Sequence, residues 1–396
     1  MTNKKHVVVL GNSGFPYGWA ENQKIILIAN CLLLTGNNVT VVCTNGIHTK
    51  KDHPDLKPHG KFEDVEYIYT SGDPYYNEKF ISRNLLKVKG KINEFLYLKK
   101  RTKERKLDFA VLSTHSFTLV LYYSILGKLF GFKTILSYVE FHSKIPKKWY
   151  RFGTRLHDYL HDSYSARLVS GIFPISEFII NHFKKTSPDK KYLKIPNLTD
   201  YERFKNTEII ETEKYFMYCG AASYKEVVFF IIDAYNRLNT SSALLYLVIN
   251  GTENDKTTIK NYINNTPQKD HIKVFSKLPE SQLNSYYKNA IALLIPLRDT
   301  YQDIARFPHK IGEYFASGNP IISTNYGEVK FYFQDRKDLL LAEQYDIDLY
   351  AEKMQFVIDH PEEAKKIGID GKNKAAPLFD YRIKAAAINN FLDSEF

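Results

Sequence analysis

Cysteine is scarce in this sequence of 396 residues, which contains only three. Cys31, Cys43 and Cys219 each lie inside an apolar segment, so we expect buried free thiols and neither a disulfide framework nor a cysteine metal site. Free thiols are typical of reducing compartments, which favours a cytoplasmic location.

Long apolar runs are also absent. Residues 25–34 are too few to span a bilayer, and Lys128 interrupts the apolar segment 117–132. The run at residues 7–10 is too short for the apolar core of a signal peptide. We therefore expect neither a signal peptide nor a transmembrane helix, while association with a membrane surface stays open.

The sequence lacks the short motifs of several enzyme classes, with no P-loop, HExxH, CxxC pair or GxSxG. Its 55 Lys and Arg outnumber its 44 Asp and Glu, which gives a net charge of +11. A basic balance suits nucleic acid, an anionic membrane surface or small anionic substrates. Because no nucleic-acid-binding module is recognisable, we expect no nucleic-acid partner.

Strand-like apolar segments alternate with helix-like segments in both halves of the chain. The expected strands are residues 6–10, 39–43, 109–113, 134–139, 172–175 and 192–195 in the first half, and 215–219, 244–249, 272–275, 290–295 and 320–323 in the second. This alternation predicts an α/β protein with two Rossmann-like, doubly wound parallel sheets, whose carboxyl edges can face one cleft. Between strands, we expect a loop-rich insertion at residues 44–80 and the interdomain linker at residues 200–213.

Two features of the first half lie at the carboxyl ends of expected strands, where open parallel sheets bind ligands. One is the glycine loop Gly11–Gly14, which precedes a helix at residues 20–34. Two glycines three apart also fit a plain tight turn. The other is His142, which with Glu140 follows the strand at 134–139 and suits either a structural or a catalytic role.

Residues 307–323 predict a tight loop, a short helix that ends at a glycine, and a buried strand. Pro308 suits the first turn of the helix, and Gly318 suits its end. Lys310 and Glu313 are three apart and so lie on the same side near the helix start. This pair fits either an exposed ion pair or a site for a ligand with phosphate and hydroxyl groups.

Two segments are basic and rich in apolar side chains. Residues 85–106 carry nine Lys and Arg against two Glu, and the apolar residues have roughly helical spacing. Residues 144–151 combine Lys and Arg with Trp149 and Tyr150. Both segments suit an anionic membrane surface, whereas 85–106 fits a solvated surface helix equally well.

The order of motifs along the chain resembles the GT-B glycosyltransferases of family 4, the retaining "glycosyl transferases group 1" type. The matching segments are Tyr218-Cys-Gly with Lys225, Val248-Ile-Asn-Gly, Val274-Phe-Ser-Lys-Leu, residues 290–296 and the Phe-Pro-x-Lys…Glu-Tyr stretch at 307–314, with 15–20, 173–176 and 194–197 in the first half. The resemblance implies a retaining hexosyltransferase that moves a sugar from a nucleoside-diphosphate sugar to an acceptor hydroxyl. It also implies a bacterial surface polysaccharide or glycolipid pathway, and a saccharide or lipid-linked saccharide as acceptor. We expect an acceptor-side domain at 1–200, a nucleotide-sugar domain at 201–375, and a helix at 376–396 that crosses back to the first domain.

The resemblance assigns roles residue by residue. Glu313 would hold the ribose hydroxyls, and Lys225 and Lys310 would lie at the diphosphate, so that no metal or other cofactor is needed. The expected catalytic residues are His142, which reaches the transferred sugar, Lys225 and Lys310. The expected donor-binding residues are Gly14, Gly220, Lys225, Gly251, Phe275, Arg306, Pro308, Lys310 and Glu313. The expected acceptor-side residues are Tyr17, Trp19 and Glu140.

The sequence departs from the family pattern at the sugar end of the site. The first acid of the family's glutamate pair is replaced by Ala305, and an arginine of the first donor-domain turn is replaced by Ala221 and Ala222. Asp303 or Arg306 could substitute. These departures leave two alternatives open, a nucleotide-sugar epimerase on the same fold and a non-catalytic nucleotide-sugar-binding protein.

Overall fold

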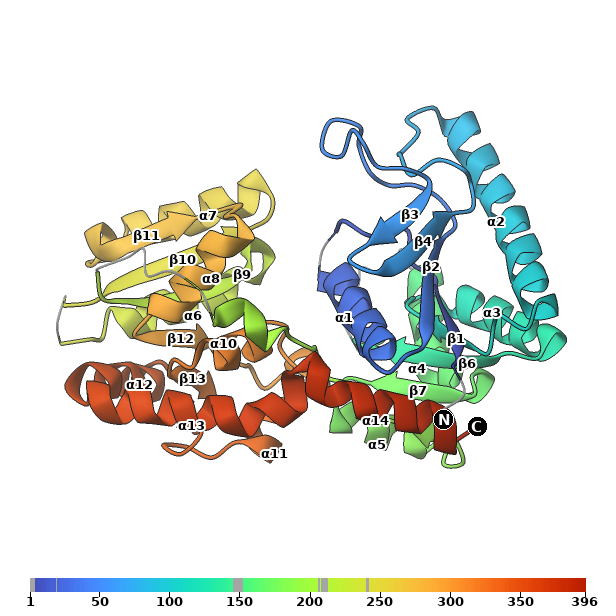
Figure 1. The fold of residues 1–396 in the computed structure, drawn as a ribbon. Coiled ribbons are helices and arrows are strands. Elements are labelled where there is room, and N and C mark those ends of the chain that lie inside the picture. The colour runs from blue at the N-terminus through green and yellow to red at the C-terminus, as the bar shows by residue number, and fades with distance from the viewer. Residues whose placement is uncertain (1–3, 19, 145–151, 206, 208–212, 240–241) are drawn as a thin grey trace. The chain divides into compact units, whose positions relative to one another are not determined.

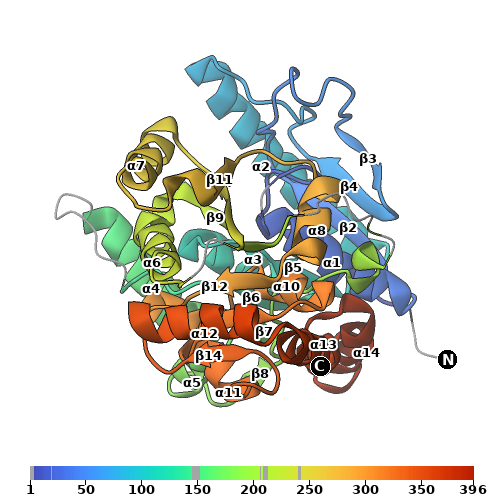
Figure 2. The ribbon, with the colours of Figure 1, turned by 90° about the vertical axis from the view of Figure 1, so that its left-hand side faces the viewer.

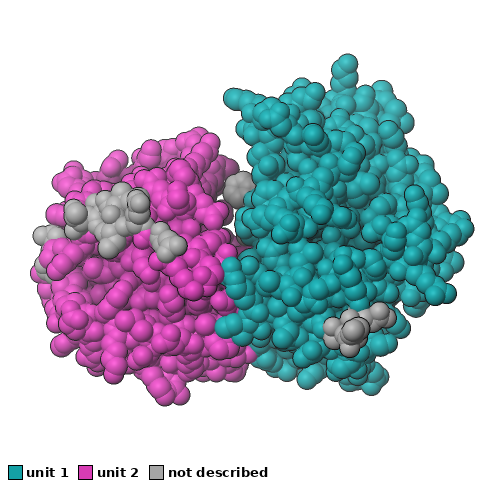
Figure 3. Space-filling view, in the orientation of Figure 1, with its two compact units in different colours: residues 1–198, 381–396 teal, residues 199–380 magenta. Residues whose placement is uncertain are grey.

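The computed structural model describes residues 4–18, 20–144, 152–205, 207, 213–239 and 242–396. The chain forms two compact units, which Figure 3 colours separately. Unit 1 comprises Met1–Leu198 and Tyr381–Phe396, and unit 2 comprises Thr199–Asp380. Each unit is built around its own sheet (Figure 1).

The sheet of unit 1 has the strand order β3-β4-β2-β1-β5-β6-β7-β8. Its strands are β1 (His6–Leu10), β2 (Asn38–Cys43), β3 (His59–Phe62), β4 (Val65–Tyr69), β5 (Phe109–Leu112), β6 (Lys133–Tyr138), β7 (Gly171–Pro174) and β8 (Lys191–Tyr192). All neighbours pair in parallel except β3 and β4, which are antiparallel. The strand order reverses at β1, so the loops after β1 and β5 flank a switch point at which parallel sheets bind ligands.

Helices cover both faces of this sheet. They are α1 (Ala20–Leu34), α2 (Phe80–Lys103), α3 (Phe117–Phe130), α4 (Phe152–Leu168), α5 (Glu177–Lys184) and α14 (Tyr381–Ser394). α1 and α14 pack side by side, and their apolar side chains join those of the central strands in one core. α2 and α3 are neighbours, with the rings of Phe95 and Phe130 5.4 Å apart. The C-terminal helix therefore belongs to the unit formed by the N-terminal half of the chain.

Unit 2 contains a wholly parallel sheet with the order β11-β10-β9-β12-β13-β14. Its strands are β9 (Tyr215–Ala221), β10 (Leu244–Asn250), β11 (Ile272–Phe275), β12 (Ala292–Ile295), β13 (Ile321–Thr324) and β14 (Leu340–Ala342). Strands buried on both faces read as continuous apolar runs, which explains why the sequence pattern located five of the six.

The helices of unit 2 alternate with its strands. They are the 3-10 helices η1 (Tyr201–Phe204), η2 (Ala222–Tyr224) and η3 (Lys269–His271), and α6 (Lys225–Tyr235), α7 (Glu253–Asn264), α8 (Glu280–Asn289), α9 (Tyr301–Ala305), α10 (Ile311–Ser317), α11 (Gly327–Tyr332), α12 (Ile347–Asp359) and α13 (Pro361–Phe379). α12 packs on α6, β13 and β14, and is followed directly by α13 (Figure 2). The two doubly wound sheets confirm the predicted fold class.

Several sequence expectations are wrong in detail. Residues 44–80 are more than a loop-rich insertion, because β4 pairs in parallel with β2 inside the sheet. The expected linker 200–213 includes η1, whose Tyr201 and Phe204 are buried within unit 2. The expected boundary at 375/376 falls inside α13, and the chain enters unit 1 only at Tyr381. These segments are polar or short and pack through a few aromatic side chains. Their sequences therefore show too little hydrophobic periodicity to predict a strand or a helix.

Among the described residues, no helix is both long enough and apolar enough to cross a bilayer. The three cysteines are buried free thiols, as expected.

Candidate active site

The carboxyl edge of the unit 2 sheet gathers most of the residues expected to bind a donor. β9 leads through η2 into α6, which begins at Lys225. β12 leads into α9 and then α10, whose N-cap is Lys310. Because parallel strands end at the same edge, the two helix starts flank one surface of the unit.

Glu313 and Lys310 form the predicted pair. Lys310 Nζ donates to Glu313 Oε2 at 2.9 Å, and the ammonium lies 5.9 Å from the ring centre of Tyr287. Arg203, from η1, donates from Nη2 to Glu313 Oε1 at 3.4 Å. The Glu313 side chain is 20% exposed, so its carboxylate is held between two cations and remains open to a ligand.

Glu313 and Lys310 each stabilise the charged form of the other. Desolvation raises the pKa of Glu313, but Lys310 and then Arg203 outweigh it, so its pKa is lowered. Desolvation lowers the pKa of Lys310, and Glu313 outweighs that effect, so its pKa is raised. Both groups are therefore charged over the neutral pH range.

Arg306 is fixed by a second group, which is centred on Asp303. Arg306 Nη2 donates to Asp303 Oδ1 at 2.6 Å, and its Nη1 donates to the Tyr224 hydroxyl at 2.8 Å. Arg298 donates to Asp303 Oδ2 from Nε at 2.8 Å and from its backbone N at 3.1 Å. The two guanidinium groups lie 5.0 Å (Arg306) and 5.8 Å (Arg298) from the ring centre of Tyr224.

This arrangement corrects the idea that Asp303 substitutes for the missing acid. Asp303 is 1% exposed and both of its oxygens are bonded to arginine, so it positions Arg306 and offers no free oxygen to a sugar. Ala305, at the position of the missing acid, is buried as well. Arg306 itself is half-buried at the edge, which is compatible with its expected donor contact.

Three other expected donor residues lie at the same edge. Lys225 opens α6, and its ammonium has no hydrogen bond or ion pair to any described residue. A Cβ on Gly220 would lie 2.3 Å from the Tyr218 hydroxyl, and one on Gly251 would lie 2.9 Å from Ala222 Cβ, so both positions require glycine. The side chains of Tyr218 and Ala222 fill the space beside these two glycines at the ends of β9 and β10.

Two further expected donor residues of unit 2 are placed differently. Phe275, at the end of β11, packs its ring 5.0 Å from Tyr246 and 5.2 Å from Tyr286 and is half-buried. Pro308 is buried and precedes α10, which begins only at Ile311. The expectation that Pro308 forms the first helical turn is therefore wrong, and the loop from Arg306 to Lys310 is longer than predicted.

In unit 1, a network of two asparagines fixes the glycine loop after β1. Asn12 Nδ2 donates to Asn22 Oδ1 at 2.7 Å, and Asn22 Nδ2 donates to the Gly14 carbonyl at 2.7 Å. Gly11 has φ 90°, and a Cβ there would lie 2.9 Å from the Ser113 carbonyl, so the turn requires glycine. The structure thus shows a preorganised loop, which the spacing of two glycines alone did not predict.

Two of the expected acceptor-side residues, Tyr17 and Glu140, lie in loops at the same edge of unit 1. Tyr17 is 38% exposed and stacks on His53 with ring centres 4.0 Å apart. Glu140 lies after β6, with its Oε2 4.0 Å from His142 Nε2. Trp19 lies outside the described residues, as do 145–151 of the expected basic segment 144–151.

His142 has a partner that the sequence analysis missed. Its Nε2 lies 3.2 Å from Nδ1 of His115, which follows β5. Desolvation lowers the pKa of His115 to about 4, with His142 acting in the same direction and Glu140 in the opposite one. Burial therefore favours the neutral form of the His115 ring.

The structure therefore brings the expected residues together as two groups, each within its own unit. Unit 2 gathers Gly220, Lys225, Gly251, Arg306, Lys310 and Glu313, and unit 1 gathers Gly14, Tyr17, Glu140 and His142. The residues missed from the sequence are Arg203, Tyr224, Arg298 and His115. Arg203 lies in a charged, aperiodic stretch, and no sequence pattern distinguishes it from its neighbours.

Comparison with known proteins agrees with this geometry. Two parallel Rossmann-like sheets with a C-terminal helix returning to the first unit define the GT-B fold. Residues 200–374, which make up most of unit 2, match the family model described as "Glycosyl transferases group 1". No curated protein sequence matches the chain.

Solved structures of GT-B glycosyltransferases share the fold along nearly the whole chain. A sucrose-phosphate synthase from Thermosynechococcus elongatus has a TM-score of 0.74 at 15% identity, with 98% of each chain covered. Anabaena HepE in complex with UDP and glucose has a TM-score of 0.70 at 14% identity, covering 98% of this chain and 100% of HepE. WaaG, a glycosyltransferase involved in lipopolysaccharide biosynthesis, has a TM-score of 0.64 at 13% identity, covering 98% of this chain and 100% of WaaG.

Proposed function

We propose that this protein is a hexosyltransferase that moves a sugar from a nucleoside-diphosphate sugar to an acceptor hydroxyl with retention of configuration. The observation that carries the proposal is the carboxyl edge of unit 2. There, Glu313 is held between Lys310 and Arg203, close to two helix starts, in a domain that matches a glycosyltransferase family. The neighbour that binds UDP and glucose supports a nucleotide-sugar donor.

Each group at this edge suits one part of such a donor. A carboxylate accepts hydrogen bonds from both hydroxyls of a ribose, which is the role proposed for Glu313. Lys225, Lys310 and Arg306 supply positive charge for a diphosphate, whose negative charge increases as the sugar–phosphate bond breaks. Gly220 and Gly251, at the ends of β9 and β10, would contact the donor through their backbone. In this proposal protein cations offset the leaving-group charge, and no metal or other cofactor is assigned.

Unit 1 would supply the acceptor side. Gly14 would lie beneath the phosphates, His142 would reach the transferred sugar, and Tyr17, Trp19 and Glu140 would contact the acceptor. The departing phosphate would assist removal of the acceptor proton on the same face of the sugar, so no separate general base is assigned. The proposal therefore requires the carboxyl edges of both units to reach one pair of substrates.

The test is incubation of the full-length protein with UDP-, GDP- and ADP-sugars, with and without a bacterial membrane extract. We expect release of nucleoside diphosphate that depends on the extract, and transfer of labelled sugar to the extracted material. Binding of a donor without turnover on any acceptor would instead support a non-catalytic binding protein. Isomerised sugar without an acceptor would support an epimerase.

Replacement of Glu313 by alanine tests the ribose contact. Loss of a hydrogen bond to a charged group is expected to weaken donor binding by about 1.5–3 kcal/mol. Equilibrium binding of UDP measures this change. The matched control is Glu280→Ala, because Glu280 also pairs with Arg203, at 3.3 Å, but is 60% exposed and has no ion pair to Lys310 among the described residues. Equal UDP affinity in both folded variants contradicts the assignment.

We also propose a cytoplasmic protein that associates peripherally with the inner face of an anionic membrane and acts on lipid-linked saccharides of a bacterial surface polymer or glycolipid. α2 exposes an apolar row at helical spacing, formed by Ile81, Leu85, Val88, Ile92 and Leu96, each more than half exposed. The adjacent α3 exposes a second row of Leu121, Ile125 and Leu129. Exposed lysines flank the first row, as in helices that lie on anionic bilayers.

The membrane proposal predicts a salt-dependent interaction. Replacing Lys99, Lys100 and Arg101 by glutamine is expected to reduce binding to phosphatidylglycerol vesicles at least tenfold, since each cation near the surface contributes about 1 kcal/mol. Vesicle sedimentation at increasing salt measures the effect. A control triple variant at the exposed Lys51, Lys57 and Lys61 should bind as the unmodified protein does. Binding that neither salt nor the first variant reduces contradicts the proposal.

A further inference from the structure

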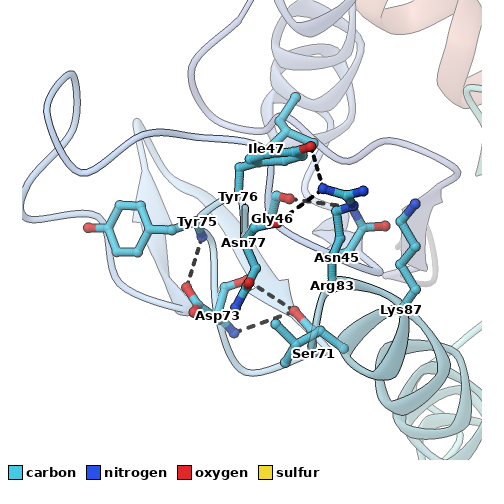
Figure 4. A pocket seen from close by; sticks show the side chains of 11 residues that line it. Asn45, Gly46, Ile47, Ser71, Asp73, Tyr75, Tyr76, Asn77, Arg83 and Lys87 are labelled. Atoms are coloured by element: carbon cyan, nitrogen blue, oxygen red, sulfur yellow. Dashed lines mark hydrogen bonds between the residues drawn. The ribbon is translucent and has the colours of Figure 1, made fainter. Parts of the chain in front are cut away.

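A small cavity in unit 1 lies outside the expected site. Its volume is about 240 Å³, and it is open to solvent (Figure 4). It lies where β2 and β4 end, and the first turns of α2 close it. The lining residues are Asn45, Gly46, Ile47, Ser71, Asp73, Tyr75, Tyr76, Asn77, Arg83, Leu86 and Lys87. The cavity therefore belongs to the carboxyl edge of the sheet, the same edge as the glycine loop and His142.

Close backbone packing makes the cavity a built feature. A Cβ on Gly46 would lie 2.0 Å from the Pro74 carbonyl carbon, and one on Gly90 would lie 2.1 Å from the Thr44 carbonyl oxygen. The loops after β2 and β4 are tied together by a hydrogen bond from Tyr76 N to the His48 carbonyl at 2.8 Å. α2 thus meets the end of β2 directly at Gly90 and Thr44, and Gly46 fixes the loop after β2 against Pro74.

Arg83 is held in position within this cavity. Its Nη1 donates to the Tyr76 hydroxyl at 2.6 Å, and its guanidinium lies 5.2 Å from the centre of that ring and 5.6 Å from that of Phe80. Nε and Nη2 donate no hydrogen bond to any described residue. A guanidinium fixed on one edge and open on the other is suited to a bidentate contact with an oxyanion.

The other lining groups complete a site for an anionic sugar. Lys87 lies one turn after Arg83 on the same side of α2, and its ammonium has no ion pair among the described residues (Figure 4). Asp73, the only carboxylate in the lining, uses Oδ1 to accept from Tyr75 N at 2.9 Å. The amides of Asn45 and Asn77 and the ring of Tyr76, 50% exposed, can bind hydroxyl groups and a sugar face. The volume is below that of drug-sized pockets, so it admits a single sugar residue.

We propose that this cavity is an acceptor subsite for a sugar residue that carries a phosphate or carboxylate group. Arg83 and Lys87 bind the oxyanion, and the amides and Asp73 bind the hydroxyl groups. This inference rests on the proposed glycosyl transfer, in which unit 1 receives the acceptor. It names the acceptor as a saccharide whose acidic residue is bound at the ends of β2 and β4.

The experiment measures binding of glucose 1-phosphate, glucuronate and glucose to the full-length protein by calorimetry. UDP binding is measured on the same samples. We expect the two anions to bind at least tenfold more tightly than glucose. Which of the two binds more tightly distinguishes recognition of a phosphate from recognition of a carboxylate. Arg83→Met and Lys87→Met should each weaken anion binding about tenfold, since each removes a charge-assisted contact. UDP affinity should not change in either variant.

Lys61→Met, which removes an exposed cation from β3, is the matched control and should bind all three sugars as the unmodified protein does. Anion binding that is absent, or that the variants at Arg83 and Lys87 leave unchanged while they remain folded by thermal unfolding, overturns the subsite. In that case, binding of UDP would still support the proposed function, because it does not depend on the cavity. A protein that binds the anionic sugars but no nucleotide refutes the proposed function and leaves the cavity as an anionic-sugar site.

Discussion

Asparagine in place of Asp303 is expected to lower the free energy of unfolding by about 3–5 kcal/mol, which is typical when one partner of a buried ion pair is removed. The carboxylate is 1% exposed and accepts hydrogen bonds from both Arg298 and Arg306. Asparagine keeps the shape but removes the charge and turns one oxygen into a donor that faces a guanidinium. The two arginines would then be partly buried without a counter-charge.

The pH dependence of Asp303 gives a second readout. Desolvation raises its pKa, but hydrogen bonding to Arg298 and the charges of Arg306 and Arg298 outweigh this, so its pKa lies below the ordinary 3.8. A carboxyl whose pKa is depressed by folding contributes stability above its unfolded pKa and loses it as pH falls through the folded value. The unmodified protein should therefore lose stability below about pH 4, and Asp303→Asn should lack this component.

Urea unfolding at several pH values measures both effects. The control is Asp299→Asn, because Asp299 lies just before α9, the helix that contains Asp303, but is exposed. Its replacement should change the free energy of unfolding by less than about 0.5 kcal/mol. UDP affinity should also fall in Asp303→Asn, because Arg306 loses the group that positions it. Equal stability of the two variants would contradict the structural role.

The sequence predicted the fold well where side chains obey a simple period. The continuous apolar runs of the central strands and the glycine stop at Gly318, which has φ 77°, appear in the structure as expected. The i, i+3 spacing also placed Lys310 next to Glu313 correctly. Such features are local, since backbone geometry fixes them within one or two turns of chain.

The parts that could not be predicted depend on contacts between distant segments. Arg203 meets Glu313 across 110 residues, and Arg306 meets Tyr224 across 82. The sequence suggested Asp303 as a substitute acid near the sugar. It does not show that Arg298, as well as Arg306, binds the Asp303 carboxylate. The cavity of unit 1 is likewise formed by the ends of two strands and a helix, and none of these three segments shows a motif.

Methionine in place of Lys24 is expected to stabilise the protein by about 5 kcal/mol at pH 6, as an upper value. Lys24 is 5% exposed, and its Nζ has no hydrogen-bond partner among the described residues. Desolvation lowers its pKa from 10.5 to about 7, although Glu21 acts in the opposite direction. Since one pH unit corresponds to about 1.4 kcal/mol, holding this ammonium charged in the fold costs about 5 kcal/mol. Methionine has a similar length and carries no charge to desolvate.

The sign of the pH dependence distinguishes this cause from ordinary packing gains. Between about pH 7 and 10.5 the unfolded chain binds a proton at Lys24 that the folded chain does not, so the stability of the unmodified protein rises with pH. The advantage of Lys24→Met should therefore shrink to about 2 kcal/mol at pH 9 and approach zero above pH 10.5. Urea unfolding across this range, with Lys61→Met as the exposed control, measures the difference. A gain that is independent of pH would indicate better packing, and no gain at pH 6 would indicate that water or a ligand already satisfies the ammonium. Only a gain that declines as pH rises identifies the buried charge itself as the source of the lost stability.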